Sequence, residues 1–136
     1  MIGILIMAHG QLGESLIQCV SYVWGERPPS LRALEIGAQD KQALLIESQR
    51  HLAELDDGNG VLLLSDVYGA TPANTMCRLL QPGRIEGVAG VNLPMLMRVL
   101  TYRHLALDVL VEKAVAGGRE GVFYITTELC DATAGH

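Results

Sequence analysis

Apolar and polar residues follow two different periodicities along this chain. Continuous apolar runs, typical of strands that are buried on both faces, occur at Ile2–Ala8, Val61–Ser65 and Val88–Val91. A more alternating run at Leu31–Ile36 predicts a further strand. The run at Gly121–Thr127 is rich in β-branched and aromatic residues, and it predicts the last strand.

Between these runs the apolar residues recur at helical spacing, with Leu12, Leu16, Val20 and Val23 along the first segment. Proline suits the first turn of a helix and glycine suits the end of one. The resulting helices come after each of the first two strands and at 72–80, 94–104 and 108–116, the last ending before Gly117 and Gly118. Alternating strands and helices predict a single α/β domain with an open, mainly parallel sheet and helices on both faces.

Composition narrows the partners that this domain can have. The chain has 136 residues, of which 49% are hydrophobic and only 4% aromatic, so one core of aliphatic side chains is expected. Its formal net charge of −5 gives no electrostatic reason to bind nucleic acid. The three cysteines have no disulfide or metal-ligand spacing, and we expect them to be buried. The first apolar run ends at His9, too short for a signal peptide or membrane span, so we expect a cytoplasmic protein.

Two polar residues follow predicted strands at the edge where parallel sheets bind ligands. His9 ends the first strand and Asp66 follows the third, and neighbouring strands lie about 4.8 Å apart. A carboxylate that accepts the Nδ1 proton of a histidine fixes the ring and leaves the Nε2 lone pair free to attack phosphorus. We therefore interpret His9 as a nucleophile and Asp66 as the group that orients it. Alternatively, Asp66 caps a helix.

The same strand ends lead into helix starts that could hold an anion. Free N–H groups and the helix dipole favour phosphate at such termini without a basic side chain. Gly10 and Gly69 would let the backbone turn tightly, and Ala70 follows in the second loop. Thr71 precedes a proline, so it is either an N-cap or an additional hydroxyl donor. The other histidines, His51, His104 and His136, are interpreted as structural or solvated.

Four sequence blocks together resemble one family. They are AHG after the first apolar run, LLLSDVYGATPAN in the middle, AGVNLPML later and GREGV near the end. In this order and over nearly the whole chain, they resemble the mannose-family IIA domain of the bacterial sugar phosphotransferase system. Residues 1–129 would form this domain and residues 130–136 a frayed tail.

The resemblance implies a function as well as a fold. It implies that His9 is the phosphorylated residue, with Asp66 as its partner and Thr71 beside the site. It also implies phospho-HPr as the phosphoryl donor and a separate IIB protein or a regulatory target as the acceptor. We expect no cofactor or metal, because the helix termini and the donor neutralise the phosphoryl charge. A homodimer that exchanges the last strand as an edge strand is expected, with membrane contact only through a permease complex.

The chain departs from the family pattern at a few positions, and other functions share parts of its pattern. Ala70 stands where the family often has a second glycine, and Val67-Tyr68 replaces the commoner hydrophobic and aromatic pair. The sequence does not contain the glycine-rich motifs of nucleotide-binding domains, which argues against that function. A hydrolase triad that contains both Ser65 and Asp66 is excluded, because consecutive residues of a strand point to opposite faces of the sheet. A phosphotransfer subunit for dihydroxyacetone kinase and a ligand-binding regulatory domain remain alternatives.

Overall fold

The computed structural model describes residues 1–134, and the side chains of residues 70–73 and 134 lie outside this description. The strands are β1 (Gly3–His9), β2 (Leu31–Ile36), β3 (Val61–Ser65) and β4 (Ile85–Ala89). The helices are α1 (Leu12–Trp24), α2 (Lys41–Leu55), α3 (Ala70–Leu79), α4 (Leu93–Tyr102), α5 (Leu107–Glu120) and α6 (Thr127–Ala134).

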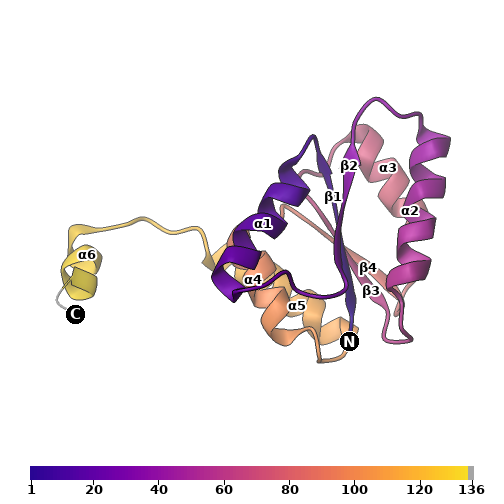
Figure 1. Cartoon of the computed structure of the whole chain (residues 1–136). Coiled ribbons are helices and arrows are strands. Elements are labelled where there is room, and N and C mark those ends of the chain that lie inside the picture. The colour runs from indigo at the N-terminus through magenta and orange to yellow at the C-terminus, as the bar shows by residue number, and fades with distance from the viewer. Residues whose placement is uncertain (135–136) are drawn as a thin grey trace.

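The strands form a four-stranded sheet in the order β2-β1-β3-β4, and every strand pairs with its neighbours in parallel. Helices α1, α4 and α5 cover one face, and α2 and α3 cover the other (Figure 1). Because β1 and β3 lie between two layers, alternate residues enter two separate cores: Ile4 and Leu62 enter one, and Leu5 and Leu63 the other. The predicted α/β class, parallel sheet and two helical layers are confirmed.

The predicted last strand at Gly121–Thr127 is wrong for the single chain. Residues 122–126 form no strand, and Figure 1 shows them leaving the body of the domain as an extended arm that leads to α6. Within this arm Tyr124 is 85% exposed. Since a strand exists only when it is paired, β-forming side chains do not make one here, where the arm extends away from the sheet. The predicted frayed tail is also wrong in part, because residues 127–134 are helical; His136 lies outside the described residues.

The helix end predicted at Gly117-Gly118 is wrong, because α5 continues through both glycines to Glu120. A Cβ at Gly117 would lie 2.7 Å from the Cβ of Arg98, and one at Gly118 would lie 2.8 Å from the Cε of Met95. These glycines therefore permit the close approach of α5 to α4. The three cysteines are exposed rather than buried, because they lie on outward positions of α1, α3 and α6.

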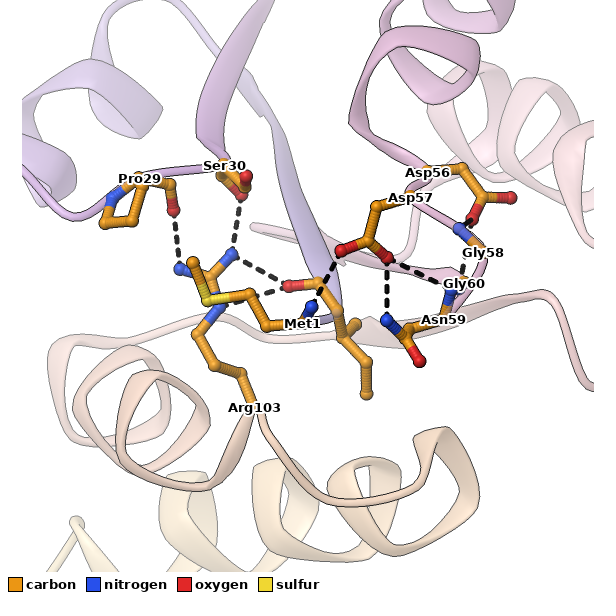
Figure 2. Close-up of polar contacts among 10 residues, drawn as sticks. Met1, Pro29, Ser30, Asp56, Asp57, Gly58, Asn59, Gly60 and Arg103 are labelled. Atoms are coloured by element: carbon orange, nitrogen blue, oxygen red, sulfur yellow. Dashed lines mark hydrogen bonds and ion pairs between the residues drawn. The ribbon is translucent and has the colours of Figure 1, made fainter.

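A buried arginine ties the end of α4 to the amino ends of two strands (Figure 2). Arg103 is 5% exposed. Its guanidinium donates to the carbonyl oxygens of Ile2, Pro29 and Ser30 at 2.6–3.1 Å. Ser30 has a left-handed backbone, with φ of 52°. Burial lowers the pKa of Arg103 and the charge of Asp57 opposes this shift, while three carbonyl oxygens accept its hydrogen bonds.

The chain start is held beside this arginine (Figure 2). The ammonium group of Met1 lies 2.7 Å from Oδ2 of Asp57, whose Oδ1 accepts from the backbone and side chain of Asn59. The Met1 ammonium and then Asn59 lower the pKa of Asp57 to about 2. The segment before β3 is thereby tied to the amino end of β1, so these contacts join the two central strands at the edge opposite to His9.

We expect Arg103→Met to destabilise the fold by about 2–5 kcal/mol, because the three carbonyls would lose their donor inside the protein. Urea unfolding followed by circular dichroism measures this change. Arg27→Met is the matched control: Arg27 pairs with Glu14 at the surface, and exposed pairs contribute about 1 kcal/mol at most. Equal unfolding midpoints for the two variants would contradict the role of Arg103.

Candidate active site

His9 and Asp66 meet at the carboxyl edge of the sheet because β1 and β3 are neighbours. Met7 pairs with Ser65 in the parallel register, so His9, two residues after Met7, and Asp66, one residue after Ser65, emerge at the same edge of the sheet. Nδ1 of His9 lies 2.9 Å from Oδ2 of Asp66. The His9 side chain is 53% exposed, whereas that of Asp66 is 13% exposed. The imidazole of His9 is therefore open to solvent, whereas the Asp66 carboxylate that it contacts is mostly buried.

Asp66 also bonds to the backbone. Its Oδ2 accepts a second hydrogen bond, from the backbone N–H of His9 at 3.0 Å, and its Oδ1 accepts from the N–H of Val67 at 2.8 Å. The N-cap of α3 is Gly69, so Asp66 is not the helix cap that was the alternative interpretation. The bond to the His9 backbone was not predicted, because no sequence signal specifies which main-chain N–H a carboxylate will take.

The electrostatics of the pair define the tautomer of His9. Burial raises the pKa of Asp66, but hydrogen bonds from the backbone and ring of His9 and from the N–H of Val67 lower it more, so the net shift is downward. An ionised carboxylate only accepts hydrogen bonds. The proton of the neutral imidazole therefore lies on Nδ1, and Nε2 carries the lone pair.

The predicted anion-binding residues lie at the starts of α1 and α3. Gly10 has φ of +57°, which favours glycine, and it connects β1 to α1. Gly69 has φ of −127°, an extended backbone that any residue adopts, so the tight turn expected there is not present. Ala70 is the first residue of α3 and Thr71 the second, so Thr71 is not an N-cap. The side chains of Ala70 and Thr71 lie outside the described residues.

Other candidate chemistry does not assemble at this edge. Within the described part of the chain, no group of three or more His, Cys, Asp or Glu side chains could hold a metal ion. Asn92 caps α4 by accepting from the N–H of Met95, and it donates to the carbonyl of Gly118, so its role is structural. Ser65 is fully buried and cannot act as a surface nucleophile. His51 lies beside Arg32 and Glu54, away from this edge of the sheet.

The parallel α/β fold thus brings one histidine and one carboxylate into contact at the carboxyl edge of its sheet. Comparison with known proteins identifies its family: the model of the EIIA-man family, described as "PTS system fructose IIA component", matches residues 3–115. The chain therefore belongs to the EIIA-man family of components of the sugar phosphotransferase system (PTS).

Relatives within this family differ in length. The mannose-specific EIIAB component of the PTS from Escherichia coli K12 is 35% identical over 124 residues, which cover 89% of this chain and 38% of that protein. The chain thus spans less than half of that relative. The fructose-specific EIIA component from Bacillus subtilis is 29% identical over 130 residues, covering 94% of this chain and 88% of that protein.

Solved structures show the same fold. The crystal structure of a phosphotransferase system component EIIA from Streptococcus agalactiae has a TM-score of 0.80 and 26% identity, and the match covers 91% of this chain and 97% of that one. The mannose/sorbose-specific IIA subunit from Enterococcus faecalis has a TM-score of 0.79 at 23% identity and supports the fold alone. The described residues contain no helix that is long and apolar enough to cross a membrane.

The His9→Ala variant should raise the pKa of Asp66. The ring would no longer donate to the carboxylate, although the backbone N–H of residue 9 would remain. Carbon-13 NMR of the carboxyl group across an acid titration measures this pKa. In the wild type, the lowered pKa adds stability that is present above the unfolded value of about 4 and is lost as the pH falls below it. An unchanged pKa in the variant would contradict the ring hydrogen bond.

Proposed function

We propose that this protein is a cytoplasmic phosphocarrier that accepts a phosphoryl group on Nε2 of His9 from phospho-HPr. The observation that carries the proposal is the 2.9 Å contact between Nδ1 of His9 and Asp66, which leaves Nε2 as the free nucleophile. Membership of the EIIA-man family supports the same role.

The transfer exchanges one phosphorus–nitrogen bond for another. The Nε2 lone pair of His9 attacks the phosphorus atom, the new N–P bond forms, and the N–P bond to the donor's histidine breaks. The electron pair of the broken bond returns to the donor imidazole. The proton on Nδ1 of His9 stays between the ring and Asp66, so the carboxylate stabilises the positive charge that the ring gains.

Backbone groups would neutralise the transferred phosphoryl oxygens. The starts of α1 and α3 have N-cap residues Gln11 and Gly69 that make no side-chain cap hydrogen bond, so first-turn N–H groups are available for an anion. Gly10, Gly69, Ala70 and Thr71 are the proposed phosphate-binding residues. In the proposed step, these N–H groups compensate the charge of the phosphoryl oxygens and Asp66 that of the ring, and no metal or cofactor takes part.

An apolar rim beside His9 supports a protein donor. Leu12 at the start of α1 is 43% exposed, and Val67 and Tyr68, which follow Asp66, are 54% and 69% exposed. Exposed apolar side chains around a reactive group favour contact with another protein surface over a small molecule. The proposed acceptor is likewise a protein, either a separate IIB component or a regulatory target, with contact to the membrane only through a permease complex.

The arm at residues 122–126 supports a homodimer. Strand β4 pairs only with β3 among the described strands, so its other edge is open beyond Ile85, which bridges to Gln81. A groove of about 780 Å³ runs along this edge, lined by residues of β4, α4 and α5 and by Val122 at the start of the arm. The neighbouring arm residues Phe123, Tyr124 and Ile125 are exposed and apolar. We propose that each arm adds a strand to β4 of a second copy.

The first test incubates the protein with phosphoenolpyruvate, enzyme I and HPr and records its intact mass. We expect one acid-labile phosphoryl group on the wild type and none on His9→Ala. Asp66→Asn should react at least about tenfold more slowly, because a hydrogen bond between charged groups contributes about 1.5–3 kcal/mol. His51→Ala is the matched control and should react normally. Phosphorylation of His9→Ala would refute the assignment.

The dimer has a separate test. Phe123→Pro/Tyr124→Pro removes two consecutive backbone donors from the arm, so it should convert the dimer to a monomer in analytical ultracentrifugation. Phe123→Ala/Tyr124→Ala keeps both donors and is the control for lost side chains. A wild type that sediments as a monomer, or a proline variant that remains dimeric, would contradict strand exchange.

A further inference from the structure

Ser65, the last residue of β3, carries a buried hydroxyl without a partner. Its side chain is 0% exposed, and within residues 1–134 its Oγ has no hydrogen-bond partner. Buried hydroxyl groups are nearly always hydrogen-bonded, because leaving one unpaired costs free energy. Ser48 on α2 shows the usual arrangement: it is equally buried, but its Oγ donates to the carbonyl of Leu44 at 2.6 Å.

The position of Ser65 connects it to the site. It faces the α2 and α3 layer, as its register partner Met7 does, and His9 is the next residue of β1 on that face. On the same face, Met76 of α3 lies over Gly87 of β4. Helix α3 begins at Ala70, five residues after Ser65 in the sequence. Ser65 therefore lies one residue row before His9 on this face of the sheet and directly precedes the proposed phosphate-binding segment in the sequence.

The segment that follows Ser65 makes two side-chain hydrogen bonds with the described side chains. Val67 donates its N–H to Asp66, and the hydroxyl of Tyr68 lies 3.8 Å from Sγ of Cys77. Val67 and Tyr68 are largely exposed. A segment with few buried contacts changes conformation at low cost. Serine side chains commonly bond to backbone groups two to four residues away, and that distance spans Val67–Gly69.

We propose that Ser65 is a positioning residue whose hydroxyl is unpaired when His9 is free and bonds to the backbone of Val67–Gly69 when His9 is phosphorylated. This inference rests on the proposed function. A phosphoryl group places negative charge beside Asp66, so the segment and the first turn of α3 close on it to donate their N–H groups. Closure brings the backbone to Ser65, and the cost of the unpaired hydroxyl then favours the phosphorylated form.

The Ser65→Ala variant should affect the unphosphorylated and the phosphorylated protein differently. The unphosphorylated variant should melt at or above the wild-type temperature, because it loses an unpaired group. With HPr and phospho-HPr at a fixed ratio, its equilibrium ratio of phosphorylated to free protein should fall about tenfold. Ser48→Ala is the matched control: it should lower the melting temperature and leave this ratio unchanged. Amide exchange of residues 67–69 should slow on phosphorylation in the wild type but not in Ser65→Ala.

The outcomes distinguish this inference from the proposed function. A wild-type protein that takes no phosphoryl group overturns both. If the wild type is phosphorylated, the inference alone is overturned by an unchanged ratio in Ser65→Ala or by a lower melting temperature of its free form. Ser65→Cys, which has nearly the same size and a weak donor, gives an independent check, because its ratio should lie between those of the other two proteins.

Discussion

The parallel pairing of β1 with β3 is the constraint on which the rest of this structure depends. Both strands are buried on both faces, so their apolar side chains fill two cores, and a shift of one residue would exchange every side chain between them. The register is therefore held by the whole core rather than by the polar residues. Because it places Met7 opposite Ser65, it also sets His9 beside Asp66. The contacts of Arg103 and Met1 hold the other end of the same strands.

Much of this arrangement was predictable because it depends on local patterns. The apolar runs gave the bounds of β2 and β3 without error, and the carboxyl-edge rule for parallel sheets singled out His9 and Asp66. Packing between distant segments was not predictable in the same way. The glycine pair in α5 reads as a helix end in the sequence, whereas its function is to admit the side chains of α4. A buried Arg103 bonded to carbonyl groups has no sequence signature at all.

The arm shows a different limit of sequence reasoning. Its β-branched and aromatic residues have the composition of a strand, yet composition reports what a segment can do and not whether an edge is available to it. In the single chain, the arm extends into solvent and the outer edge of β4 stays open (Figure 1). These two features have complementary chemistry. The edge of β4 offers unpaired backbone groups, and the arm offers a short apolar segment that can pair with them.

The two hydrogen bonds from His9 to the same oxygen of Asp66 have a consequence for how variable this site can be. One bond comes from the imidazole and the other from the main chain of the strand, so the carboxylate fixes the ring relative to the sheet itself. The direction of Nε2 is thus set by the main chain of β1. A substitution in the surrounding loops that leaves Asp66 in place should therefore leave the orientation of the imidazole unchanged.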